Sequence, residues 1–220
     1  MIELKDVSYT YPHTVQEALH HLSLVMEPGR CILMTGPSGA GKTTLCLAAC
    51  GILFHEYGGK KAGIVTINGR DVSAYTGLSE IAKNIGIVFD DAEAQMIFTT
   101  VEEEILSALE YRGLTPEEIE KRLASIMEVT YLTALKGRSP HNLSGGQKQR
   151  VALAATLALG NEILILDEPT SELDEHATKR IVEILSNLKR QGKTILIVEH
   201  KYSHFRDMVD TLVVMEHGAI

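Results

Sequence analysis

The segment Gly36–Thr43 constrains this chain more than any other part of the sequence, because it follows the pattern G-x-x-x-x-G-K-T. A short apolar run, residues 31–35, precedes it, and residues 43–54 have a pattern typical of a helix. Glycines let backbone N–H groups curl around phosphate oxygens, and the positive end of the following helix points at the same group. The pattern therefore predicts a buried strand, a phosphate-binding loop and a helix, in that order.

Two side chains of this loop have predicted chemical roles. Lys42 is expected to reach the β- and γ-phosphates of a nucleotide, and the Thr43 hydroxyl is expected to ligate Mg²⁺. The backbone of the rest of the loop is expected to surround the phosphates. The predicted contacts there are Gly36, Pro37, Ser38, Gly39, Ala40 and Gly41.

A second candidate element is an apolar run that ends in two carboxylates, Asp167 and Glu168. At the carboxyl end of a buried strand, Asp167 can hold Mg²⁺ through water, as in other phosphate-loop enzymes. Glu168 is then placed to polarise the attacking water as a general base. An apolar run followed by Asp-Glu is common by itself, and the phosphate loop in the same chain makes this interpretation specific.

The third element is the pentapeptide LSGGQ, residues 143–147. Ser144 can cap the helix that follows, and the two glycines let the backbone approach a phosphate closely. This predicts a second anion-binding segment on the same chain. One nucleotide does not need two such loops from one molecule, so we expect this one to cover a nucleotide held by a second molecule.

The remaining pattern alternates strands and helices at both ends of the chain, with a helical stretch between them. Asn68-Gly69 after an alternating run predicts a hairpin turn, and Thr115 to Glu118 predicts a capping box. Together these features predict a parallel-sheet core, a β-hairpin region and a separate helical subdomain. The predicted strands are residues 2–9, 20–26, 31–35, 63–67, 86–89, 162–166, 194–198 and 211–215, and the predicted helices are 43–54 and 175–190, with helical structure from about 100 to 159.

Composition excludes several classes of protein. The chain of 220 residues has a formal net charge of -8 and no strongly basic stretch, which argues against general nucleic-acid binding. Its N-terminus lacks the apolar region of a signal peptide, and no apolar run approaches the ~20 residues that span a bilayer. The three cysteines have no metal-type spacing and are predicted to be buried and reduced. Because no apolar run is long enough to span a bilayer, a transport role would require another chain as the membrane path.

With these motifs in place, the chain resembles the nucleotide-binding subunits of ABC transporters. LSGGQ resembles their signature motif, QKQRVALAATLA resembles the helix after it, and the similarity runs from Met1 to Ile220. The resemblance implies an α/β fold: a P-loop NTPase (RecA-like) core with an antiparallel β subdomain, at about 1–89 and 160–220. A helical subdomain with the signature is expected at about 90–159.

The resemblance also implies ATP and Mg²⁺ as cofactors and a head-to-tail dimer. Each ATP would lie between the phosphate loop of one subunit and the signature motif of the other. The signature residues expected to contact it are Ser144, Gly145, Gly146 and Gln147.

Further site residues follow from the same resemblance. Tyr11 matches the aromatic residue that stacks on adenine, with Tyr9 the less favoured choice, and Thr44 is expected to touch the α-phosphate. Residues 171–174 resemble the loop that crosses the dimer interface, and His200 resembles the switch histidine at the γ-phosphate and attacking water. The expected catalytic residues are Glu168, His200 and Lys42.

One position departs from the family pattern. Where the family has a Gln that ligates Mg²⁺, after the strand GIVF, this chain has Asp90. Asp is shorter and anionic, but Mg²⁺ accepts carboxylate oxygens, so we expect a retained but altered metal contact. A regulatory ATP-binding subunit with weak hydrolysis therefore stays an alternative. A soluble ABC ATPase unconnected with transport is a second, although its usual coiled-coil inserts and basic extensions are absent.

The stretch VFDDAEAQMIFTTVEEEI resembles a segment of energy-coupling-factor importers, which take up vitamins or cobalt and nickel ions. Gln95 has the expected spacing there, and the acidic residues from Asp90 to Glu104 are expected to receive a basic coupling helix. The implied partners are a second ABC ATPase subunit, a transmembrane coupling subunit and a substrate-binding membrane subunit. The implied location is cytoplasmic, on the inner face of the membrane.

The sequence stops at MEHGAI, where the family usually continues, which leaves open a short subunit, a truncated one or half of a fused tandem.

Overall fold

The computed structural model describes residues 1–220 and contains two β-sheets. The first is parallel, with strand order β6-β7-β8-β3-β9, and the second is antiparallel, with order β2-β1-β4-β5. The parallel strands are β3 (Cys31–Thr35), β6 (Ile85–Val88), β7 (Ile163–Asp167), β8 (Thr194–Val198) and β9 (Thr211–Val214). The antiparallel strands are β1 (Ile2–Thr10), β2 (Leu19–Met26), β4 (Lys60–Ile67) and β5 (Arg70–Asp71).

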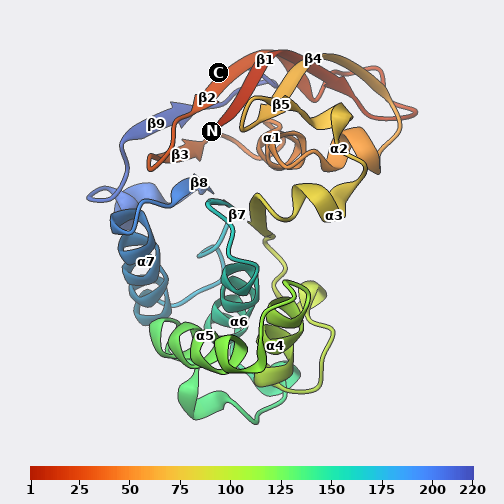
Figure 1. Ribbon diagram of the computed structural model, residues 1–220. Helices are drawn as coiled ribbons and strands as arrows, with labels where there is room; N and C mark the ends of the chain where they lie inside the picture. The colour runs from red at the N-terminus through yellow and green to blue at the C-terminus, as the bar shows by residue number, and fades with distance from the viewer.

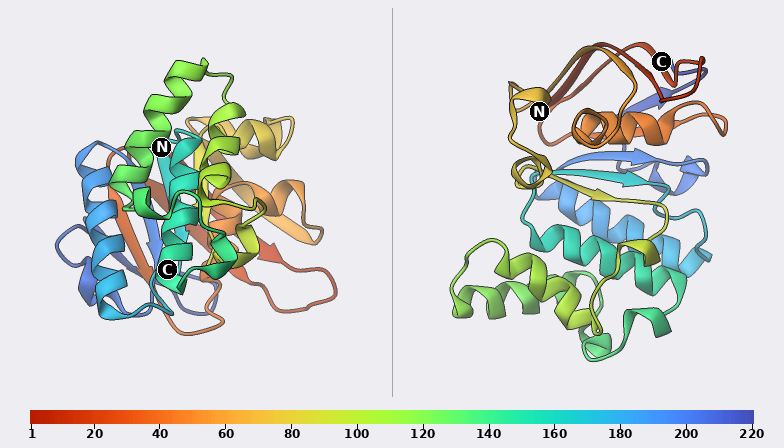
Figure 2. Two further views of the ribbon diagram at one scale, coloured as in Figure 1. Left: turned by 90° about the horizontal axis from the view of Figure 1, so that it is seen from below. Right: turned by 90° about the vertical axis from the view of Figure 1, so that its right-hand side faces the viewer.

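The sheets and helices form layers, which Figures 1 and 2 show from three sides. Helix α1 (Lys42–Ala49) lies between the antiparallel sheet and the parallel sheet. Helices α6 (Gly145–Ala158) and α7 (Glu175–Arg190) cover the opposite face of the parallel sheet. Helices α4 (Val101–Glu110) and α5 (Pro116–Val129) pack beyond α6. The short helices are α2 (Ile52–His55) and α3 (Leu78–Ile81), and the 3-10 turns are Val72–Ala74, Glu93–Gln95, Thr133–Leu135, Pro140–Asn142 and Tyr202–Phe205.

Side chains along the parallel strands point alternately to the two faces of the sheet, so both faces must be covered. On β3, Ile32 and Met34 join the core that contains α1, whereas Cys31 and Leu33 join the core that contains α6 and α7. Successive side chains of a strand point to opposite faces, so a continuous apolar run must be buried on both sides. All five residues of β7 and of β8 are buried accordingly.

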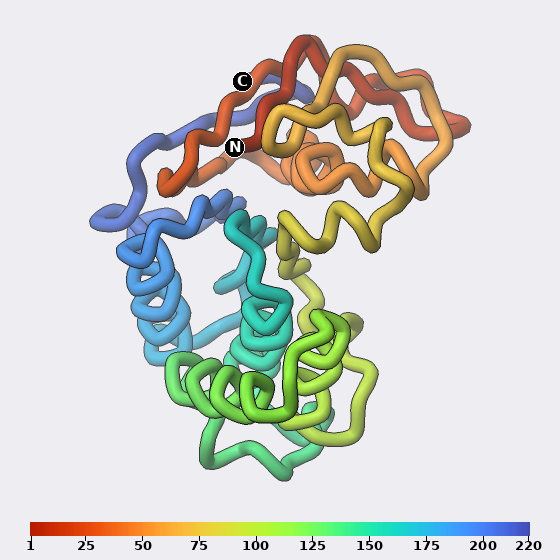
Figure 3. Tube along the Cα trace, viewed as in Figure 1, coloured from red at the N-terminus to blue at the C-terminus, as the bar shows by residue number.

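The topology gathers several predicted residues at one edge of the parallel sheet. The phosphate loop follows β3, Asp90 comes shortly after β6, Asp167 ends β7 and Glu168 follows it, and His200 comes shortly after β8. These four strands are parallel, so their carboxyl ends meet at a common edge, where open α/β sheets bind ligands. Figure 3 shows the chain leaving this sheet after β6, passing through α4 and α5, and returning along α6 to β7.

The predicted helix over residues 43–54 is wrong in one respect, because it breaks after Ala49. Gly51 has a φ of 75°, and a Cβ there would lie 2.7 Å from Cδ1 of Ile81. The left-handed conformation ends α1, and α2 begins at the next residue.

The Asn68-Gly69 turn is confirmed, with φ values of 52° and 80° between β4 and β5. The capping box at Thr115 is also confirmed.

The three cysteines are buried and unpaired, as predicted. Burial raises the pKa of Cys31 and of Cys50 to about 12, and that of Cys46 well above its ordinary value. Such thiols carry almost no thiolate at neutral pH and act as small apolar groups in the core. None of the helices combines the length and apolarity needed to cross a membrane.

Candidate functional site

The glycines of the phosphate loop serve two different purposes. A Cβ at Gly36 would lie 2.1 Å from the carbonyl oxygen of Met215, and one at Gly41 would lie 2.3 Å from that of Ala18. These two glycines are required by close backbone packing. Gly39 has a φ of 78° and nothing within 4 Å of a Cβ position, so its side faces open space. A phosphate group can approach the backbone at Gly39.

Lys42 lies across the loop that precedes it. Its ammonium donates hydrogen bonds of 3.0 Å to the carbonyl oxygens of Gly36 and Pro37, and the residue is only 6% exposed. An ammonium has three N–H donors, so these two neutral acceptors leave one donor and the whole positive charge for an anion. The position therefore suits the predicted contact with phosphate.

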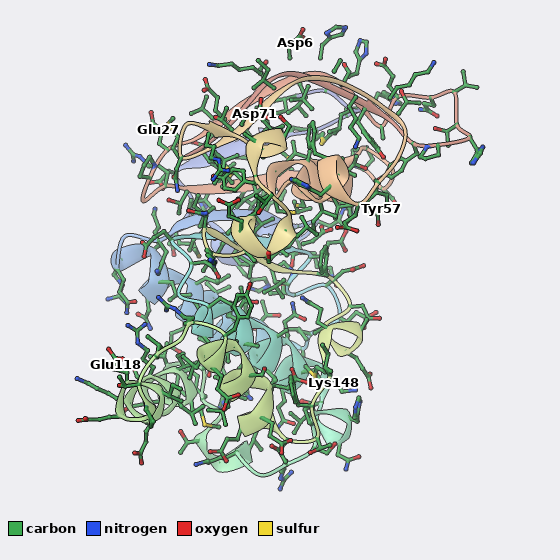
Figure 4. All side chains as sticks on the ribbon, turned by 45° about the vertical axis from the view of Figure 1, so that its right-hand side comes forward. Asp6, Glu27, Tyr57, Asp71, Glu118 and Lys148 are labelled. Carbon is green, nitrogen blue, oxygen red and sulfur yellow. The ribbon has the colours of Figure 1, made fainter.

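The two candidate aromatic residues occupy different environments. Tyr9 is 2% exposed and donates a hydrogen bond of 2.7 Å to the carbonyl oxygen of Gly58, so it is a core residue. The Tyr11 hydroxyl is half-buried and lies 3.2 Å from that of Thr44 on α1. The Tyr57 ring, seen in the upper half of Figure 4, packs edge-on against Tyr11 with centroids 6.1 Å apart. Tyr11 is thus the aromatic side chain tied to the phosphate-loop helix.

Asp167 is a buried carboxylate that accepts no hydrogen bond of normal geometry, although the Thr43 hydroxyl lies near it. The residue is 1% exposed, and neither of its oxygens has a hydrogen-bond partner. Burial raises the pKa of Asp167, and the nearby carboxylates of Asp90 and Glu168 act in the same direction, whereas the Thr43 hydroxyl and Lys42 oppose them. A buried anion without well-formed hydrogen bonds is costly, and a bound cation would relieve that cost.

The residues around Asp167 fit a Mg²⁺ ion that arrives with a nucleotide. The chain contains no group of three or more His, Cys, Asp or Glu side chains placed to hold a metal ion. Mg²⁺ commonly takes one or two carboxylates and completes its shell with phosphate oxygens and water. Asp167, the exposed Thr43 hydroxyl and Asp90 could supply the protein oxygens for such a shell.

We expect Asp167→Asn to raise the thermal midpoint of the nucleotide-free protein by a few degrees at pH 7.5, since 1 kcal/mol corresponds to about 2–4 °C at this size. The folded pKa of Asp167 is raised, so its ionisation destabilises the fold at pH values above that pKa. The advantage of Asn should shrink as the pH falls towards about 4, where the unfolded carboxyl is protonated too. Thermal melts of both proteins and of an exposed control, Asp207→Asn, provide the measurement. An unchanged midpoint at pH 7.5 would contradict this account of Asp167.

Glu168 and His200 form a pair at the carboxyl edge. His200 Nε2 lies 3.2 Å from Glu168 Oε1, and the two side chains are 44% and 29% exposed, respectively. Glu168 has a φ of 48°, which is strained for a residue with a side chain, and its N–H donates to the carbonyl oxygen of Val198. Both side chains can therefore reach a water molecule at this edge. Glu168 also borders a cleft of about 590 Å³ that Asp90 and Gly145 line as well.

The LSGGQ segment begins α6, on the opposite face of the parallel sheet from α1. The Ser144 N–H donates a hydrogen bond of 3.0 Å to Oε1 of Gln147, so Gln147 caps its own helix. A Cβ at Gly146 would lie 2.6 Å from that of Ala177, which makes glycine necessary there for packing against α7. No residue of the phosphate loop lines the cleft that Gly145 borders. The chain therefore presents its two glycine-rich segments separately.

A family model described as ABC transporter matches residues 19–171. This chain belongs to the ABC transporter family. It is 51% identical over 220 residues to a Methanosarcina mazei protein named as an ABC transporter ATP-binding protein, and 50% identical over 220 residues to one from Methanosarcina acetivorans. Each match covers 100% of this chain, which spans 44% and 42% of the length of these relatives.

Solved ABC structures have the same fold. cbiO1 from Clostridium perfringens, part of the ABC transporter complex cbiONQ, superposes with a TM-score of 0.87 at 29% identity, covering 99% of this chain and 85% of that one. The dimeric ATP-binding cassette MJ0796, in a post-hydrolysis state bound to ADP and Pi, superposes with a TM-score of 0.86 at 27% identity, covering 100% of this chain and 96% of that one. The predicted fold class is confirmed.

Most carboxylates of the acidic segment of this ABC cassette, Asp90 to Glu104, have partners within the chain, so only part of the segment is free to receive a basic helix. Glu93 pairs with Lys148, which Figure 4 labels in the lower half of the molecule, and Glu102 pairs with Lys136 at 2.8 Å. Glu103 completes the capping box of α4, and the buried Glu104 accepts hydrogen bonds from two backbone N–H groups. Lys148 also lowers the pKa of Glu93.

Asp90 and Asp91 are the two acidic side chains of this segment that stay exposed without a basic partner. They are the ones still available to a basic partner, and reversing the charge of Glu93 would break an ion pair inside the cassette. Gln95 has a local structural role as well, because its Oε1 accepts a hydrogen bond of 2.9 Å from the Phe89 N–H at the end of β6. The spacing of Gln95 in the sequence does not indicate that bond.

Proposed function

We propose that this cassette binds Mg-ATP and hydrolyses it as one half of a head-to-tail dimer that energises a membrane transporter. The observation that carries the proposal is the meeting of the phosphate loop, the buried Asp167 carboxylate and the Glu168–His200 pair at one sheet edge. Phosphate release from ATP by the purified chain, with and without Mg²⁺, is the test. Absence of Mg-dependent release at any ATP concentration would refute hydrolysis.

Each residue of the edge has a proposed task. Tyr11 stacks on the adenine, Thr44 touches the α-phosphate, and the backbone around Gly39 and the Lys42 ammonium bind the remaining phosphates. Thr43, Asp167 and Asp90 hold Mg²⁺, which supplies positive charge against the phosphate oxygens. Glu168 accepts a proton from the attacking water, and His200 orients that water and contacts the γ-phosphate.

The dimer is proposed because the two glycine-rich segments begin helices on opposite faces of the parallel sheet. One molecule therefore offers its phosphate loop and its signature segment as two half-sites. Ser144, Gly145 and the N-terminus of α6 would bind the γ-phosphate of a nucleotide held by the partner. The dimeric state of the similar cassette MJ0796 supports this arrangement. Loss of the γ-phosphate would remove a contact to each partner and favour opening.

An importer of the energy-coupling-factor group is the transporter we propose. The likeness to cbiO1, which is part of the cbiONQ complex, supports this assignment together with the motifs after β6. The proposed partners are a second ABC ATPase subunit, a transmembrane coupling subunit and a substrate-binding membrane subunit. The cassette would then lie on the cytoplasmic face of the membrane. Co-purification with a membrane coupling subunit tests this assignment separately from hydrolysis.

A regulatory subunit with weak hydrolysis is a second candidate, and Asp90 is the observation that favours it. Asp90 increases the negative charge beside Asp167, as its effect on the pKa of Asp167 shows. If Asp90 contacts Mg²⁺, Asp90→Gln should keep or raise the hydrolysis rate, and Asp90→Ala should fall about 10-fold below it. The Ala variant should also need more Mg²⁺ for half-maximal rate. Equal rates in the two variants would exclude a metal role for Asp90.

A further inference from the structure

Glu199 is a buried carboxylate at the same sheet edge that has no part in the function proposed above. It lies between the last residue of β8 and His200, and it is 1% exposed. Its backbone N–H donates to the carbonyl oxygen of Met34, which continues the pairing of β8 with β3. A buried carboxylate is costly unless hydrogen bonds compensate it, so the partners of its oxygens are informative.

Both oxygens of Glu199 accept hydrogen bonds from residues next to the Glu168–His200 pair. Oε1 accepts from the N–H of Thr170 at 2.8 Å and from the Thr170 hydroxyl. Oε2 accepts from the N–H of His200 at 3.1 Å. Thr170 is 7% exposed and lies two residues after Glu168, where the chain turns towards residues 171–174. One carboxylate thus joins the turn after β7 to the peptide after β8.

Glu199 accepts the only hydrogen bonds between residues 169–174 and residues 199–201. The pairing of β7 with β8 ends with the bond from the Glu168 N–H to the carbonyl oxygen of Val198. No backbone hydrogen bond joins residues 169–174 to residues 199–201. The other side-chain contact at this edge joins His200 Nε2 to Glu168, and its length depends on how the two peptides are held.

We propose that Glu199 is a positioning residue for hydrolysis, which holds His200 at a fixed distance from Glu168 by fixing Thr170. The expected effect on kcat rests on the proposed function, whereas the positioning of His200 by Glu199 does not. Residues 171–174 start at Thr170, so a displacement of that segment would first strain the Thr170–Glu199 hydrogen bonds. Glu199 would transmit the displacement to the peptide of His200.

Two variants test this role in complementary ways. In Glu199→Gln, the amide nitrogen cannot accept a hydrogen bond, so either Thr170 or His200 loses its acceptor. Thr170→Val keeps the backbone N–H and removes only the hydroxyl, which provides a milder variant should Glu199→Gln fold poorly. Glu162→Gln is the matched control, because its side chain is 79% exposed at the other end of β7.

Both variants should lower kcat for ATP by about 10- to 100-fold, with the larger loss in Glu199→Gln, because small displacements of a catalytic group have effects of that size. KM should stay within about twofold of wild type, because no phosphate or base contact is removed. The effect should also be non-additive: Glu199→Gln in a His200→Ala background should lower kcat no further. A purely structural role would add to the effect of His200→Ala.

NMR of the histidine rings supplies a readout that does not depend on hydrolysis. At one pH, the ring signals of His200 should move in both variants, whereas those of His55, bonded to the Val72 carbonyl on another part of the fold, should not. Unmoved His200 signals would overturn the inference, and so would additive kinetics. Wild-type protein that fails to hydrolyse ATP would refute the proposed function alone, because the NMR comparison still decides the role of Glu199.

Discussion

Replacing Glu168 by Gln will lower kcat for ATP hydrolysis about 1,000-fold, within the range of general-base catalysis. Gln has almost the same shape but cannot take a proton from the attacking water. The strained φ of 48° and the bond to Val198 involve only the backbone of Glu168, so the substitution should leave the backbone there unchanged. KM for ATP should change little. Steady-state phosphate release over a range of ATP concentrations measures both constants.

The control for this prediction is Glu172→Gln. Glu172 is an exposed carboxylate that lines the same cleft as Glu168, so its substitution changes the charge of the cleft equally. Near-wild-type kcat in Glu172→Gln, beside the loss in Glu168→Gln, would attribute the effect to the general base. Equal losses in the two variants would show that the charge of the cleft matters and would contradict the role of Glu168.

Mixing two inactive variants will restore activity if the half-sites belong to different molecules. Lys42→Ala removes the charge of the phosphate loop, and Ser144→Arg places a bulky cation at the start of α6 in the signature segment. Each variant alone should lose nearly all hydrolysis, because both sites of its dimer contain the defect. In a mixed dimer one site carries both defects, and the other site is intact.

The expected recovery is quantitative. Each mixed dimer keeps one of its two equivalent sites intact, so a mixture that pairs at random should recover about a quarter of the wild-type sites, and one in which the variants dimerise only with each other about half. Phosphate release from a 1:1 mixture, compared with each variant at the same total concentration, measures the recovery. A mixture no more active than its two components would place both defects in one site and contradict composite sites.

The carboxyl-edge part of the site could be predicted from the sequence because it depends on local patterns. An apolar run ending in a glycine-rich loop or in Asp-Glu places those residues at a strand end wherever the strand lies. Parallel pairing then brings the ends of β3, β7 and β8 together. The buried state of Asp167 follows from the same pattern, but its lack of well-formed hydrogen bonds is visible only in the structure.

The contacts that the sequence could not indicate are those between side chains and distant backbone. Glu93 and Lys148 are 55 residues apart along the chain, and no periodicity links them. Glu199 and Thr170 are 29 residues apart, and their bond depends on how two turns meet beyond the ends of β7 and β8. The need for glycine at position 51, where the first helix breaks, also involves a distant residue, because a Cβ there would meet Ile81. The local sequence pattern does not indicate any of these three contacts.

If two molecules together enclose each nucleotide, the nucleotide should control the state of association of the Glu168→Gln variant. Sedimentation of this variant should show monomers without nucleotide and dimers with Mg-ATP, because ATP that is not hydrolysed keeps both half-sites joined. Adding Ser144→Arg should abolish the dimer while Mg-ATP still binds. Glu168→Gln protein that remains monomeric with saturating Mg-ATP would contradict the claim.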